Sequence, residues 1–258
     1  MNFKLKLFVI LWLAGLAGVL SFLAVDLSQL LANIPVAAGT APLPSPVMLK
    51  LVSVIQPAVL VSLAVWVGVA LASRVGLTAP VAEAIAANRS VWVAFKPQIV
   101  PGLIGCLIGS GLLFLIWMVW KPLLPPEFVT RGLALNALTP LVTRLLYGGF
   151  TEELLLRWGV MTLLVWAPWR LFQRGQGEPH AIYMTSAIVI SSVVFGVGHL
   201  PIAIMLSPVV TVALVSYIVM GNTVFGLIAG YLYWKKGLEA AMLAHMLIHV
   251  ILVIVGPV

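Results

Sequence analysis

Long apolar runs, separated by short polar segments, dominate the pattern of the chain. The runs lie at residues 7–25, 47–73, 99–120, 134–168, 181–200, 207–234 and 237–257. As a helix, each run can cross the roughly 30 Å hydrocarbon core of a bilayer. Backbone groups cannot stay unpaired in lipid, so the runs are predicted to be helical. The predicted fold is an all-α, polytopic membrane bundle of seven transmembrane helices, with eight as the alternative.

Some features interrupt this simple pattern. The fourth run is too long for one simple span, and we expect it to break or bend near Gly148-Gly149, while Gly221-Asn222 falls in the middle of the sixth. The polar segment 74–97 is predicted to form a helix lying on the membrane surface. The first run follows two lysines, as in a signal peptide, but it is long for one and is predicted to be a retained span.

Composition supports a membrane protein and excludes a soluble one. Hydrophobic residues make up 62% of the 258 residues, charged residues only 8%, and the mean hydropathy is +1.17. No soluble domain hides that much apolar surface. No soluble domain is visible, so we expect residues 1–258 to form one transmembrane domain whose first helices, within 1–140, precede the region that carries the unusual polar residues.

The distribution of basic residues predicts the orientation. The net charge is +7, and most basic residues sit at the ends of apolar runs, which is typical of membrane topology rather than of nucleic-acid binding. With the N-terminus inside, nine basic residues fall in inner segments and two in outer ones. We therefore expect a multi-pass protein of the cell membrane with a cytoplasmic N-terminus. Its expected partners are the lipid bilayer and membrane-bound peptides or proteins, not nucleic acid. Its oligomeric state stays open.

Three ionisable side chains fall within an apolar run, in the stretch GGFTEELLLRWG. Each costs about 2.5–3.5 kcal/mol at mid-membrane on insertion scales. Glu153 and Arg157 are four residues apart on one helix face and can form an ion pair. Glu152 lies about 100° away and is left out of that pair. A carboxylate in such a position is suited to act as a general base.

Three histidines also lie in apolar runs. His199 precedes a proline, and His245 and His249 are four apart and share one helix face. With Glu152 they allow two chemistries. The four side chains could bind zinc, since imidazole and carboxylate are zinc ligands. Alternatively, Glu152 and His199 activate a water while His245 and His249 donate hydrogen bonds to an oxyanion.

The order of these motifs resembles a known family. EELLLR matches an E-E-x-x-x-R motif, FGVGH matches F-x-x-x-H through Phe195 and His199, and HMLIH occupies the place of an H-x-x-x-N/D motif. This pattern is similar to that of the CPBP (CAAX protease and bacteriocin-processing enzyme) family of intramembrane endopeptidases, which includes the type II CAAX prenyl proteases and the bacterial Abi proteins. The resemblance covers residues 145–252 and identifies them as the expected catalytic core.

The resemblance implies a role for each matching position. Glu152 would activate water with the help of His199, His245 would help to stabilise the oxyanion, and Glu153 and Arg157 would orient the site. Phe195 would support it. His249 departs from the family's Asn or Asp; its imidazole N–H can still donate a hydrogen bond, but a third histidine also makes zinc more plausible than usual.

We therefore expect an intramembrane, glutamate-dependent endopeptidase that cleaves a membrane-associated substrate, with prenylated CAAX-type peptides among the candidates. No cofactor is expected, and zinc is the alternative. The competing hypotheses are a non-catalytic scaffold, immunity or regulatory protein of the same fold, and a proton relay or transporter. The last ranks lowest, because the chain shows no related halves.

Overall fold

Six long apolar helices make up most of the molecule. The computed structural model describes residues 2–26 and 45–255, which form helices and connecting turns. Six of these helices, extended in places by a short adjoining helix, are long and apolar enough to cross a membrane: α1 (Phe3–Ser21), α3 (Pro46–Leu71), α5 (Val91–Trp120), α9 (Ala181–Gly198), α11 (Val212–Lys236) and α12 (Leu238–Val255). The chain is thus a multi-pass helical membrane protein, as predicted.

A seventh rod has a different internal structure. It runs through α7 (Leu141–Thr143), the π-helices η4 (Arg144–Glu152) and η5 (Leu154–Met161), and α8 (Thr162–Leu171). The chain does not break at Gly148-Gly149, because it continues there as a π-helix, and the alternative of a bend stays a prediction. π-Helical turns are rare and occur frequently at functional sites. With this rod, the described residues contain seven helices of membrane-spanning length.

The Gly221-Asn222 pair does not interrupt its helix, and the expected surface helix is shorter than predicted. Helix α11 continues through Gly221-Asn222, where the Asn222 amide donates to the Ile218 carbonyl at 2.8 Å and so stays within the helix. The surface helix expected at 74–97 is only the short α4 (Pro80–Ala86), because α5 already begins at Val91.

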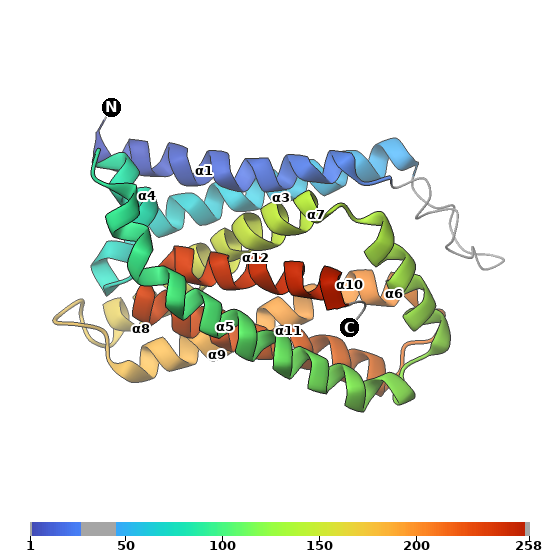
Figure 1. Cartoon of the computed structure of the whole chain (residues 1–258). Helices are drawn as coiled ribbons and strands as arrows, with labels where there is room; N and C mark the ends of the chain where they lie inside the picture. The colour runs from blue at the N-terminus through green and yellow to red at the C-terminus, as the bar shows by residue number, and fades with distance from the viewer. Residues whose placement is uncertain (1, 27–44, 256–258) are drawn as a thin grey trace.

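Short helices connect the long ones at their ends. They are η1 (Phe22–Ala24), η2 (Ala72–Val75), η3 (Lys121–Leu123), α6 (Pro126–Leu138) and α10 (Leu200–Leu206). Figure 1 shows the N-terminus, α4, the α8–α9 connection and the α11–α12 turn at one end of the bundle, and α6 and α10 at the other. The contacts of α6 with α10, and of α4 with α1 and α12, agree with this arrangement.

The two ends differ in charge. We call the first the basic end, because the helix termini and connections there carry Lys4, Lys6, Arg74, Arg89, Lys96, Arg170, Arg174, Lys235 and Lys236. The opposite, α6 end carries Lys121 and Arg131 in η3 and α6, and Lys50 near the start of α3. Helix α12 lies inside the bundle and packs against η4, α5 and α11. The polar side chains of these central elements therefore face one another within the bundle.

Candidate active site

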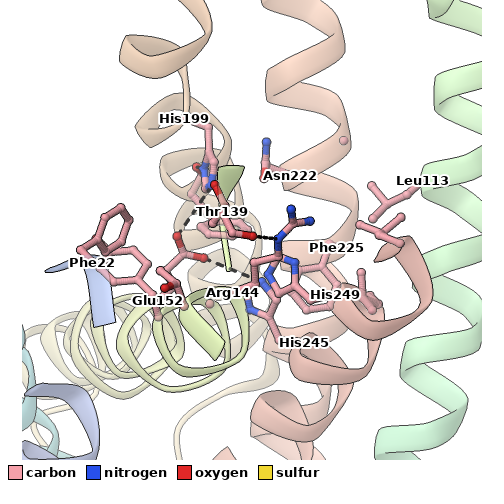
Figure 2. Close-up of a pocket in the computed structure, with 17 residues that line it drawn as sticks. Phe22, Leu113, Thr139, Arg144, Glu152, His199, Asn222, Phe225, His245 and His249 are labelled. Carbon is pink, nitrogen blue, oxygen red and sulfur yellow. Dashed lines mark hydrogen bonds and ion pairs between the residues drawn. The ribbon is translucent and has the colours of Figure 1, made fainter. Parts of the chain in front are cut away.

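A cavity of about 210 Å³ lies between η4, α9, α11 and α12. The side chains of Glu152, His199, His245 and His249, from three separate rods, line it together. Figure 2 shows the Glu152 carboxylate pointing toward His199 on one side and His245 on the other. The structure thus brings together the four side chains that the sequence singles out.

Glu152 faces two imidazoles without touching either. Its Oε1 lies 3.8 Å from Nε2 of His199, and its Oε2 lies 3.7 Å from Nε2 of His245. These separations exceed a direct hydrogen bond and suit groups that share a bridging water. The Glu152 side chain is 17% exposed and that of His199 is 31% exposed, so the cluster is open to the cavity.

The end of helix α9 fixes the orientation of His199. A helix terminus leaves carbonyls without partners, and here the backbone N–H of His199 donates to the Gly196 carbonyl rather than to that of Phe195. The carbonyl of Phe195 instead faces Nδ1 of His199 at 2.8 Å. A carbonyl only accepts, so Nδ1 carries a proton, and Nε2 faces Glu152. The local sequence F-x-x-x-H therefore builds one half of the site.

His245 is oriented by the second glutamate. Its Nδ1 lies 2.8 Å from Oε1 of Glu153, which leaves Nε2 facing Glu152 and the cavity. Glu153 is fully buried and forms the expected ion pair with Arg157, at 3.3 Å between Oε2 and Nε. A carboxylate behind a histidine fixes the ring orientation, as is common in catalytic and metal sites.

Arg157 is held from two further sides. Its terminal nitrogen Nη2 donates to the Gly226 carbonyl of α11 at 3.1 Å, and its guanidinium lies 5.1 Å from the centre of the Phe195 ring. The Phe195 ring also meets the His199 ring edge-on at 4.7 Å. Phe195 therefore connects the buried ion pair to the open half of the site.

Two glycines allow η4 to approach α12. A Cβ atom at Gly148 would lie 2.5 Å from Nε2 of His249 and 3.2 Å from Nε2 of His245, and a Cβ at Gly149 would overlap Met246. His249 stacks on His245 with ring centroids 5.0 Å apart. The glycine pair that precedes the glutamates thus leaves room for the histidine face of α12.

The cluster does not form a compact metal site. Within residues 2–26 and 45–255, no group of three or more His, Cys, Asp or Glu side chains is placed to hold a metal ion. The zinc set of Glu152, His199, His245 and His249 therefore stays an alternative without a converged ligand group in the structure, and we derive no step through a metal.

Some residues of the cavity were not foreseen. Arg144, Asn222, Thr139 and Tyr147 line the cavity as well, and none of them belongs to the three motifs. Arg144 offered a signal, because an arginine in an apolar run two turns before Glu152 is itself costly. Thr139 and Tyr147 carry no comparable signal in the sequence.

Fold and site together define a polytopic helical membrane protein with a glutamate–histidine cluster inside its bundle. Residues 134–251 match the family model described as "Type II CAAX prenyl endopeptidase Rce1-like". This match supports assignment to that family of CAAX-type intramembrane proteases, and the matched segment contains all seven residues of the three motifs. No curated protein and no solved structure matches the chain.

Proposed function

We propose that the protein is an intramembrane endopeptidase that uses Glu152 as its general base. The observation that carries this proposal is the Glu152 carboxylate in a cavity, facing the Nε2 atoms of His199 and His245 at 3.8 and 3.7 Å. A packed polar network without a cavity would favour a non-catalytic scaffold. The cavity beside Glu152 supports catalysis instead.

In the proposed reaction, Glu152 takes one proton from a water that is also hydrogen-bonded to the unprotonated Nε2 of His199. The water oxygen attacks the scissile carbonyl carbon, and the developing oxyanion accepts hydrogen bonds from His249 and from Nε2–H of His245, which acts as an imidazolium whose Nδ1–H donates to Glu153. The proton held by Glu152 then passes to the leaving nitrogen as the C–N bond breaks. The products are a new carboxylate and a new amine. Glu153 and Arg157 act as positioning residues through His245.

The test is cleavage by the purified protein in liposomes. The substrates are membrane-anchored peptides, a prenylated CAAX-type peptide first and its unprenylated counterpart second. Removal of a general base costs about 10²–10⁴-fold, so Glu152→Gln should slow cleavage by that factor. His180→Ala is the matched control, because His180 is an exposed residue at the start of α9, at the basic end. Equal cleavage rates for wild type and Glu152→Gln would contradict the proposal.

We further propose that the protein lies in the cell membrane with the basic end in the cytoplasm. Cytoplasmic segments carry the excess of Lys and Arg, and the basic end carries nine of them. His199 caps the end of α9 that points toward α10, so the site lies in the half of the bundle nearer the α6 end. In this orientation the site faces the non-cytoplasmic side.

Cysteine labelling on intact cells tests this orientation. The native Cys106 is buried and is replaced by alanine as background. Thr130→Cys places a thiol on the exposed surface of α6, and Gln176→Cys places one on the exposed connection at the basic end. A membrane-impermeant maleimide should label the first variant and reach the second only after lysis. The reverse pattern would invert the topology and put the site on the cytoplasmic side.

A further inference from the structure

A second cavity adjoins the candidate site. It measures about 380 Å³ and shares Thr139, Arg144, His199, His249 and Leu252 with the first. Its other walls come from α5, α6 and α11 and are largely apolar, with Trp117, Phe128, Leu135 and Tyr217 among them. The two cavities together extend from Glu152 to the inner face of α6. Such a space can accommodate a substrate peptide that continues beyond the scissile bond.

Arg144 lies where the two cavities meet. Its Nε donates to the Thr139 carbonyl at 3.1 Å, and its terminal nitrogen Nη2 donates to the Asn136 carbonyl. Figure 2 shows its guanidinium beside Thr139, in the part of the pocket that holds Asn222 and His249. Both acceptors are neutral carbonyls near the end of α6. A guanidinium has five N–H donors, so donors remain for a ligand.

The two arginines of this rod differ in their counter-charge. Arg157 pairs with Glu153, whereas none of the ion pairs in the described parts of the chain involves Arg144. A cation at the junction of two largely apolar cavities is costly without an anion. Arginine binds carboxylates through two parallel hydrogen bonds, which makes a carboxylate its best-matched organic ligand.

We infer that Arg144 is a receptor for a carboxylate group of the substrate, close to the bond that Glu152 attacks. The inference rests on the proposed function and deepens it. The carboxylate is either the free C-terminus of a peptide or an acidic side chain; both present the same chemistry to a guanidinium. Arg144 thereby acts as a specificity-determining residue that selects substrates by charge in a site whose other walls are apolar.

An alternative role for Arg144 is that it only caps α6, because basic side chains often donate hydrogen bonds to the last carbonyls of a helix. A capping role affects the stability of α6 but cannot distinguish an acid from an amide. The chain offers a matched control in Arg131, whose Nη1 donates to the Leu206 carbonyl at 3.3 Å at the same end of the bundle. Arg131 is not among the residues that line either cavity.

The experiment measures binding without turnover. The Glu152→Gln protein in nanodiscs is titrated with a fluorescent, N-palmitoylated apolar peptide in three forms: a free C-terminal acid, a C-terminal amide, and the amide with one internal Gln replaced by Glu. Hydrogen bonds to a charged group are strong, so we expect the acid or the Glu peptide to bind roughly ten- to a hundredfold tighter than the plain amide. The form that binds more tightly than the plain amide, the C-terminal acid or the Glu peptide, identifies the source of the carboxylate.

The arginine variants, made in the same Glu152→Gln background, then decide the assignment. Arg144→Gln should abolish the preference for the carboxylate, Arg144→Lys should reduce it, and Arg131→Gln should leave it intact. Equal affinities for all three peptides, or a preference that survives Arg144→Gln, overturn the inference. If Arg144→Gln does not fold, an undiminished preference in Arg144→Lys overturns it. Failure of the peptidase proposal alone is distinguishable. In that case the wild-type protein cleaves no peptide, while the carboxylate preference in binding stays intact.

Discussion

Glu152 and Glu153 are neighbours in the sequence but lie in opposite environments. Glu153 is fully buried, pairs with Arg157 and contacts Nδ1 of His245. Glu152 is partly exposed to the cavity and stands at 3.7–3.8 Å from two imidazoles without a direct hydrogen bond. One carboxylate is thus buried in a dry network of an ion pair and a hydrogen bond, and the other is open to a reactant.

The difference separates two tasks within one turn of helix. A buried ion pair contributes little net stability, but removing one partner is costly, so the dry network fixes its members in place. We call Glu153 and Arg157 the dry half of the site, and Glu152 and His199 the open half. His245 belongs to both halves, because its two nitrogens face the two different glutamates. The dry half thereby fixes the geometry in which the open half reacts.

The largest effect on stability is expected from the dry half. Glu153→Ala leaves the buried Arg157 without its anion and should lower the free energy of unfolding by about 3–5 kcal/mol. Glu152→Gln removes no such pair and should change it by about 0.5 kcal/mol or less, as substitutions at accessible positions do. Thermal denaturation in detergent, followed by tryptophan fluorescence, measures both. Similar losses in the two variants would show that the glutamates do not divide the work as described.

Gly148 tests how closely the two halves must meet. A methyl group at this position would lie 2.5 Å from Nε2 of His249, so Gly148→Ala should push the histidine face of α12 away from Glu152. Small misplacements of reacting groups cost on the order of a hundredfold, and we expect cleavage to fall by roughly ten- to a hundredfold.

Gly111→Ala is the control for this change. Gly111 is another helical glycine, in α5, and a Cβ atom there meets nothing within 4 Å. Alanine favours a helix over glycine by about 1 kcal/mol, so this control should be at least as stable as wild type and equally active. Full activity in Gly148→Ala would mean that His249 and His245 can shift without consequence.

The dry half was the more predictable one. The spacing of Glu153 and Arg157 alone predicts their ion pair, and the same periodicity leaves Glu152 out of it. The count of apolar runs predicts the seven rods, because the cost of unpaired backbone in lipid leaves few alternatives. These features depend on local periodicity and on the solvent, both of which can be read from one sequence.

The open half depends on packing that no local pattern encodes. The π-helical turns of η4, the continuity of α11 through Asn222, and the cavity that reaches Arg144 all arise from how separate helices meet. The sequence could suggest that three histidines form a site with Glu152. It could not show that His199 and His245 face the carboxylate while His249 stacks behind His245.

The smallest effect is expected from metal removal. Zinc needs ligand atoms at about 2.0–2.2 Å around one centre. In the described parts of the chain no three His, Cys, Asp or Glu side chains converge in that way. Dialysis against EDTA and 1,10-phenanthroline should therefore leave the cleavage rate of the reconstituted protein unchanged, with thermolysin treated in parallel to show that chelation worked. A loss of activity that zinc restores would reassign Glu152 and the histidines as ligands, and the open half of the comparison would then be a metal site rather than a water-activating pair.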